Sequence, residues 1–319
     1  MKKSQSPALA QTPLRQTHKQ SLWQYILRKK YLYLMLIPCV VYFFIFNYIP
    51  MGGVVIAFKK FSFKKGIWGS PWIGFENFTY MFSLKDFYNV FKNSMYLSFL
   101  RVFLTFPVPI ILALMLNEIN NGLYQKTLQT IFYLPHFISW VVVGSILTNF
   151  LSPSNGVINR VLELAGMEKV FFLAEKSWFR PLVILTSIWK EAGWGTIIYL
   201  AAITGVPSDI YEAARIDGAS HFQTLRYITL PCIKSTIVIM LVLRMGSITS
   251  NGFEQIFIMQ NNMNLAVSEV FETYTYRVGL ASGRYSFATA VGLFTSLISV
   301  AFLLTSNKIA NMLGEEGIW

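Results

Sequence analysis

Long apolar stretches, separated by short polar segments, make up most of the chain. Three of these stretches carry no charged residue, and they cover 31–58, 127–159 and 285–307. A helix needs roughly 20 mostly apolar residues to cross the hydrocarbon core of a bilayer. Each stretch is long enough, so the pattern predicts three membrane-spanning helices, which are spans one, three and six in chain order.

Three further apolar stretches reach spanning length only if charged residues inside them are tolerated. They are 93–117 around Arg101, 181–204 around Lys190 and Glu191, and 235–258 around Arg244 and Glu254. An ionisable group in hydrocarbon is costly, so we expect these side chains to face a bundle interior or a water-filled cavity. As spans two, four and five, these stretches complete an all-α integral membrane protein with six transmembrane helices.

The segments outside the spans are expected to form two tails and one large loop. The expected division is an N-terminal tail over 1–30, a six-helix domain over 31–306 that contains a loop at 207–231, and a C-terminal tail over 307–319. Ser21 is placed to cap a short helix at the membrane surface, ahead of the basic residues that close the first tail. A cleaved signal peptide is the alternative for 31–58, but that run is about twice the usual length of a signal-peptide core.

Composition agrees with the membrane class. Hydrophobic residues make up 54% of the chain and charged residues only 13%, which excludes an ordinary soluble domain. Cys39 and Cys232 lie in different segments and form no disulfide framework, and the three histidines lack the spacing of a metal site. The net charge of +12 is spread along both membrane surfaces, which favours lipid rather than nucleic acid as its partner. Lysine and arginine counts on the two sides are level, so charge alone does not set the orientation.

The polar loop between spans four and five has its own order. Asp209 and Glu212 are spaced as in a capping box, which predicts a helix that continues to Ile216. Gly218 stands where a left-handed residue would end that helix, and a second helix is predicted from about Ser220. The loop therefore reads as a helix-turn-helix that projects from the membrane.

This loop resembles the coupling loop of binding-protein-dependent ABC importer permeases. The residues that match the family's fixed positions are Glu212, Ala213, Ala214, Gly218, Ile228, Leu230 and Pro231. Asp217, directly before the glycine, resembles the carbohydrate-uptake branch. Looser similarity at 252–255 (GFEQ) and 274–280 (YTYRVGL) extends the resemblance to permeases for complex oligosaccharides, of the rhamnogalacturonan or alginate uptake type.

The resemblance implies a division of labour among several chains. A second homologous permease would share the pathway, an ATPase dimer would bind ATP and Mg, and an extracellular solute-binding protein would deliver an oligosaccharide. The loop and both termini would then be cytoplasmic, in a protein of the cytoplasmic (inner) membrane. The chain itself has no GxxxxGK[ST] phosphate loop, so we expect no cofactor, no metal and no enzymatic activity on it.

The resemblance also implies a mechanism for the loop. Small side chains at Ala213 and Ala214 would allow close approach to the ATPase, and Glu212 would offer a carboxylate for a charge-assisted bond. Gly218 would set the angle between the two short helices. Movement of the ATPase would thereby switch the access of the pathway. The plain alternative is an amphipathic loop that lies on the membrane surface.

Spans four and five carry the residues that we expect along the substrate pathway. These are Lys190, Glu191, Trp194, Arg244, Asn251, Glu254 and Gln255. Polar and glycine residues at 246–252 weaken the helix at membrane depth, which is tolerated where backbone lines a cavity or is buried in protein. Aromatic faces and polar groups together are what a sugar site needs. The alternative is that these charges pair with one another and only fix helix packing.

Three other ionisable residues are assigned mainly structural places. Arg101 is expected to be structural or near the outer interface. His136 follows a proline at a predicted kink and is expected to be packed, whereas His221 is placed on the coupling surface. Three cations, Arg101, Lys190 and Arg244, nevertheless stand at spanning depth against only two carboxylates. One cation is therefore formally unpaired, which suggests that the transported sugar is acidic or partly acidic.

Two other classes of membrane protein are less consistent with the sequence. An ion-coupled secondary transporter would also use intramembrane charges, but it needs no coupling loop. A membrane-embedded enzyme requires convergent catalytic groups, and the sequence offers no Ser/His/Asp set, metal cluster or carboxylate pair at catalytic spacing.

Overall fold

The computed structural model describes residues 28–119, 121–315 and 317–318, and it divides the chain into two units at Gly53. In the first unit, α2 (Lys30–Phe43), a π-helical turn (Phe44–Tyr48) and α3 (Ile49–Met51) follow one another without a gap. None of the side chains in these three elements is buried, which suits a helix surrounded by lipid or by a partner chain. The predicted surface helix that Ser21 would cap lies outside the described residues.

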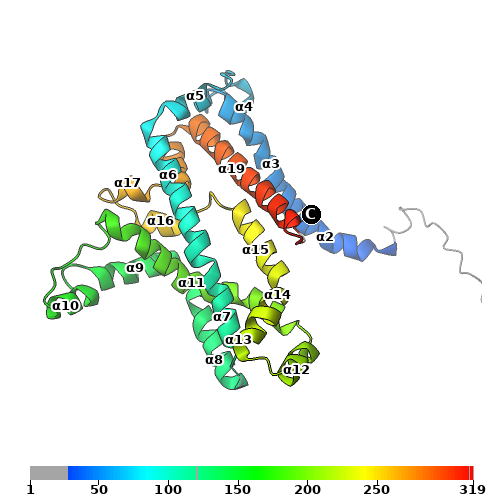
Figure 1. Ribbon diagram of the computed structural model, residues 1–319. Helices are drawn as coiled ribbons and strands as arrows, with labels where there is room; N and C mark the ends of the chain where they lie inside the picture. Colours follow the sequence, from blue (N-terminus) through cyan, green and yellow to red (C-terminus); the bar gives the residue numbers. More distant parts are fainter. Residues whose placement is uncertain (1–27, 120, 316, 319) are drawn as a thin grey trace, which may run out of the picture. The chain divides into compact units, whose positions relative to one another are not determined.

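The second unit, Val54–Trp319, consists of helices and one isolated bridge between Lys59 and Trp72 in its described part (Figure 1). Its helices in the first half are α4 (Gly66–Gly69), α5 (Glu76–Ser83), α6 (Lys85–Leu100), α7 (Pro107–Asn117), α8 (Gly122–Tyr133), α9 (Trp140–Leu151) and α10 (Val157–Leu164). Those in the second half are α11 (Lys176–Thr204), α12 (Ser208–Ile216), α13 (His221–Thr224), α14 (Leu230–Cys232), α15 (Lys234–Gly246), α16 (Phe253–Met259), α17 (Leu265–Ser268), α18 (Phe271–Tyr276) and α19 (Tyr285–Met312).

Short turns of tighter or wider helix join several of these elements. Three-ten turns cover Gly52–Phe58 and Leu134–Phe137, and π-helical turns cover Arg101–Thr105, Leu225–Thr229 and Arg277–Ala281. The π turn Arg101–Thr105 joins α6 to α7, so that Lys85–Asn117 forms a 33-residue helical span. Single π-helical turns within α-helices are frequent at functional sites.

Three helical segments are long and apolar enough to cross a membrane among the described residues: Lys30–Phe58, Lys85–Asn117 and Tyr285–Met312. Two further pairs meet the same test but are bent, and counting each pair as one span gives five. The fourth predicted span, 181–204, lies within α11, which is 29 residues long but contains charged residues along its length. All six predicted segments are therefore largely helical, although only three are unbroken apolar spans.

The continuous third span predicted over 127–159 is wrong, because the chain bends by 95° between Gly122–Phe137 and Trp140–Leu151. Pro135 lies in the three-ten turn that ends the first part, where its missing N–H weakens the helix. Ser139 then caps α9 by accepting a hydrogen bond from the backbone N–H of Val142. The kink predicted beside His136 is confirmed.

The fifth predicted span, 235–258, is also interrupted. Helix α15 ends at Gly246, and α16 starts only after Gly252, whose φ of 77° lies in the left-handed region. The predicted weakness at 246–252 is thus confirmed as a break in the helix. At the other end of the chain, α19 continues through 307 to Met312, so only the last residues of the predicted C-terminal tail lie beyond the helix.

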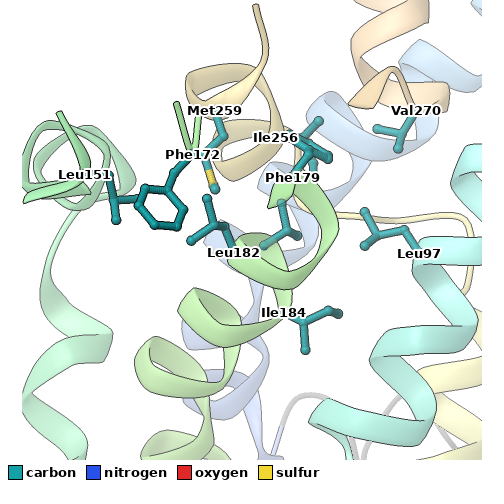
Figure 2. Packing of buried hydrophobic residues seen from close by; sticks show 10 residues of the cluster. Leu97, Leu151, Phe172, Phe179, Leu182, Ile184, Ile256, Met259 and Val270 are labelled. Carbon is teal, nitrogen blue, oxygen red and sulfur yellow. The ribbon is translucent and has the colours of Figure 1, made fainter. Parts of the chain in front are cut away.

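Helix α11 is central to the second unit. Its upper half packs Phe179, Leu182 and Val183 into a buried apolar cluster that also receives Leu97 from α6 and Ile256 from α16 (Figure 2). This packing holds span two near Leu97, the N-terminal part of α11 and the short helix α16 around one core. Side chains attached to these three elements are therefore fixed relative to one another.

Candidate substrate cavity and coupling loop

A cavity of about 390 Å³ lies among span two, the bend in span three, α11 and α15. Its polar and aromatic lining residues are Arg101, Thr105, His136, Glu191, Trp194, Tyr199 and Arg244. The volume falls in the usual range for small-ligand sites, which is about 300–1,000 Å³. A cavity that carries charged groups in its wall and lies among segments predicted to span the membrane is the geometry expected of a transport pathway.

Arg101 is held in the wall of this cavity by Gln255 of α16. The side chain of Arg101 is only 5% exposed, and its Nη2 donates to Oε1 of Gln255 over 2.5 Å. Gln255 in turn accepts from the Ser187 hydroxyl and donates to Thr186 and to the Val183 carbonyl of α11. This network anchors one end of the arginine, its Nη2, because every polar atom of the buried Gln255 amide is bonded.

Glu191 and Arg244 face the same cavity from α11 and α15. Glu191 lies within electrostatic range of both Arg101 and Arg244, but neither guanidinium group forms an ion pair within 4 Å of it in the described part of the chain. Arg244 also makes no side-chain hydrogen bond there. The cavity lining thus presents two cations and one anion.

His136 and Trp194 form an aromatic surface in the cavity lining. Their rings are stacked, with centroids 4.6 Å apart and an interplanar angle of 3°. The bend in span three brings His136 to α11, and Trp194 stays 46% exposed. Flat aromatic faces beside charged groups are suited to sugars, which offer C–H surfaces as well as hydroxyls.

The other predicted pathway residues do not line this cavity. Lys190 is buried and donates from Nζ to the His136 carbonyl, while Asn251 is buried between Ser94, Ser98 and Glu272. Glu254 is exposed on α16. Of the seven predicted residues, Glu191, Trp194 and Arg244 therefore line the cavity. Gln255 lies outside it and accepts the hydrogen bond that holds Arg101 in the cavity wall. The alternative of internal ion pairs among these charges is not realised in the described residues.

The sequence did not single out Arg101 and His136 as cavity residues. Arg101 was expected to be structural or interfacial, and it is both buried and cavity-lining. Two features of the sequence indicate a special position for Arg101. It is a charged residue within an apolar stretch, and two prolines soon after it are typical of an irregular helix. His136 packs against Trp194, as predicted, and it also lines the cavity. It lies next to the 95° bend between Phe137 and Trp140, which is sharper than the predicted kink.

The loop at 207–231 folds as two short helices joined at Gly218. Gly218 has a φ of 75°, and the N–H of Ala219 donates to the Ala214 carbonyl to close α12. The second helix is capped by Ser220, which exchanges side-chain and backbone hydrogen bonds with Gln223 in a complete capping box. The Tyr211 hydroxyl donates to Thr229 over 3.3 Å and ties the two helices together.

The predicted capping box at Asp209 and Glu212 is wrong. Helix α12 begins at Ser208, so Asp209 lies inside the first turn, and no side chain caps Pro207 at the start. A carboxylate in the first turn still interacts favourably with the helix dipole. The box lies instead at the second helix of the same loop, where Ser220 precedes Gln223 by three residues.

The loop leaves one face open. Glu212, Ala213 and Asp217 are exposed, and Ile216 is 86% exposed, whereas Ala214 is only 7% exposed and packs within the loop. Leu230 and Ile228 are partly buried, and Pro231 lies in the first turn of α14. In Figure 1, α12 and α13 lie beside the lower ends of α7 and α8, far from α4 and α5. The residues predicted to couple to an ATPase thus lie toward one end of these helices.

Beside the loop, Glu118 at the end of α7 contacts the second helix. Its Oε2 lies 3.0 Å from Nε2 of His221. A side-chain contact therefore joins the end of α7 to the loop between α11 and α15. His221 is 83% exposed, so this contact lies at the surface of the protein.

Comparison with known proteins identifies the family. The family described as binding-protein-dependent transport system inner membrane component matches residues 87–311. The chain belongs to this family. It is therefore a permease subunit of a binding-protein-dependent ABC importer, and an integral protein of the inner membrane.

Two curated proteins of Bacillus subtilis (strain 168) are similar over almost their whole length. Protein LplB is 43% identical over 98% of this chain and 99% of its own. The polygalacturonan/rhamnogalacturonan transport system permease protein YteP is 43% identical over 99% of this chain and 98% of its own. The similarity to both proteins thus extends over almost the whole of this permease.

Solved structures agree with the sequence comparison. A bacterial alginate ABC transporter in complex with an alginate pentasaccharide-bound periplasmic protein contains a chain that is 42% identical, with a TM-score of 0.85 over 93% of this permease and 99% of that chain. A second structure, of a bacterial ABC transporter involved in the import of the acidic polysaccharide alginate, gives 43% identity and a TM-score of 0.84.

Proposed function

We propose that this permease, together with a second homologous permease, forms the pathway for an acidic or partly acidic oligosaccharide. The observation that carries the proposal is the cavity in which Arg101 and Arg244 face a single carboxylate, Glu191, beside the stacked rings of His136 and Trp194. Two similar proteins are named for polygalacturonan and alginate, which are polymers of uronic acids, and this supports the choice of an acidic sugar.

An external solute-binding protein delivers the oligosaccharide, and an ATPase dimer drives its import. The loop 207–231 is the ATPase-coupling element, with Glu212, Ala213, Asp217 and Gly218 at the contact. The exposure of this face, and its place at one end of the helices, support the assignment. ATP and Mg are bound by the ATPase chains, in keeping with the lack of a phosphate loop in this sequence.

The chain crosses the membrane six times in this proposal, with the two bent pairs and α11 each counted as one crossing. An even number of crossings places both termini on the side of the coupling loop, which is the cytoplasm. The family match favours the importer function over the alternative of ion-coupled secondary transport, which would need no ATPase.

The test is uptake into proteoliposomes that contain both permeases and the ATPase, with the cognate binding protein outside. The probes are tetragalacturonate and the tetrasaccharide obtained by reducing its carboxyl groups. The proposal predicts uptake of the acidic probe that needs both ATP and the binding protein. Uptake driven by a proton or sodium gradient with this chain alone would contradict it.

A further inference from the structure

Unpaired polar atoms gather around the cavity. Four buried side-chain atoms lack a hydrogen-bond partner in the described residues, and three of them belong to cavity-lining residues: Arg101 Nε, Thr105 Oγ1 and His136 Nδ1. Buried polar groups are paired in the large majority of cases, so a cluster of exceptions needs an explanation. A polar ligand that binds in the cavity is the simplest one, because the three residues share this cavity.

The charges in the cavity wall indicate that the ligand is an anion. Arg101 uses one nitrogen, Nη2, to hold Gln255, and Arg244 makes no side-chain hydrogen bond within the described chain. Glu191 attracts both guanidinium groups from the cavity wall, and Glu272 attracts them from outside the cavity. Glu272, however, already accepts bonds from the Ser250 hydroxyl and the Asn251 N–H. The cavity wall itself therefore retains an excess of donors and of positive charge.

We infer that Arg101 and Arg244 form a carboxylate-binding subsite that receives the uronate groups of the oligosaccharide one after another. This inference rests on the proposed function and adds the residues that bind the carboxylate group of the sugar. A guanidinium group offers donors in a planar fork that matches a carboxylate, which makes arginine better suited than lysine to this task. Thr105 and His136 complete the site by meeting the sugar hydroxyls beside the carboxylate.

The unpaired atoms show what must change when the sugar binds. Each of them is closed off by neighbouring atoms in this conformation, so Arg101, Thr105 and His136 have to turn toward the cavity to meet a ligand. The π-helical turn Arg101–Thr105 carries two of the three and is a less regular part of span two. Glu191 competes with the sugar for both arginines, so it lowers the affinity of the subsite for each uronate group.

The experiment compares the same two tetrasaccharide probes in the complete importer with single substitutions of this permease. Arg244→Gln is the main variant, because Arg244 supports no other described side chain through a hydrogen bond. We expect it to lower the uptake rate of tetragalacturonate about tenfold or more, the usual effect of losing a bond to a charged group, and that of the reduced probe less than about twofold. Arg101→Lys keeps the charge but not the fork, and we expect it to act in the same selective way.

Two matched variants control for charge. Glu191→Gln removes the competing carboxylate from the same cavity, and we expect it to raise uptake of the acidic probe. Lys169→Gln removes an exposed cation outside the cavity, where it pairs with Glu163 of α10, and should change neither rate. Equal loss for both probes in Arg244→Gln, or no loss, would overturn the inference. If the wild-type importer carries the acidic probe but Arg244→Gln shows no selective loss, the inference fails while the proposed function stands. If the wild-type importer carries only the reduced probe, or neither probe, both fail.

Discussion

The ammonium group of Lys190 donates a hydrogen bond to the backbone carbonyl of His136 over 2.6 Å. Lys190 is only 7% exposed, and its Nζ also lies 5.5 Å from the centre of the Trp140 ring. The residue therefore links the middle of α11 to both sides of the 95° bend in span three. That bend is what brings His136 to the cavity, so Lys190 acts on the cavity through its position and does not line it.

Replacing Lys190 with Met should test this role. The side chain keeps its length but loses the donor, so the His136 carbonyl loses its charged partner. We expect a loss of about 1.5–3 kcal/mol of stability, seen as a lower Tm of the detergent-solubilised complex. Uptake of acidic and neutral oligosaccharides should fall by the same factor. A selective loss of acidic uptake would instead place Lys190 among the groups that contact the substrate.

Substitution of Gln255 should destabilise the protein strongly. Its amide is 1% exposed and joins Arg101 to three residues of α11. Gln255→Met leaves the buried guanidinium group of Arg101 without its partner, and we expect a loss of about 3 kcal/mol or more in thermal or denaturant unfolding. The double variant with Arg101→Met should be less destabilised than the sum of the two single variants. Additive losses would mean that the two side chains do not depend on each other.

Gly193 allows α11 to lie against the backbone of α8. A methyl group at this position would collide with the carbonyl group of Phe132, which cannot move aside as a flexible side chain would. Gly193→Ala should therefore destabilise the protein by about 1–3 kcal/mol and reduce its yield in the membrane. Gly292→Ala in α19 is the matched control, because a methyl group there meets no atom within 4 Å. Similar yields and Tm values for the two variants would contradict the close packing.

The angle of the coupling loop depends on a left-handed residue at Gly218. A β-branched residue disfavours that conformation, so Gly218→Val should cost about 1–2 kcal/mol locally and lower ATP-driven uptake. Gly218→Asn is the matched control, because Asn tolerates the left-handed region best among the other residues. Uptake should fall more for Val than for Asn, while the amount of protein in the membrane stays the same. Equal uptake in both variants would show that the angle is not critical.

The helical segments and the elbow of the loop could be predicted from the sequence, because both depend on local patterns. Apolar length defines a span, and Gly218 followed by Ser220 and Gln223 defines the turn and the second cap. The start of α12 was placed less accurately, since Asp209 and Glu212 have the spacing of a capping box but lie inside the helix.

The composition of the cavity could not be predicted in the same way. Arg101 and Gln255 are 154 positions apart, and Lys190 and His136 are 54 apart, so their contacts depend on how the helices pack. Sequence reasoning recognised that charges in spans must face something polar, and this applied to Arg101, Lys190 and Arg244. The 95° bend in span three and the break after Gly246 decide which of these residues line the cavity. No local sequence pattern specifies the geometry of the bend or of the break.

The most direct test of the account is the rate of ATP hydrolysis by the reconstituted importer, measured with and without the sugar-loaded binding protein. Wild-type permease should give hydrolysis that the loaded binding protein stimulates and that accompanies uptake. Glu212→Ala, which removes the exposed carboxylate of the coupling loop, should abolish most of the stimulation and the uptake while the permease still inserts into the membrane. Full stimulation and normal uptake in Glu212→Ala would contradict the coupling role of this loop.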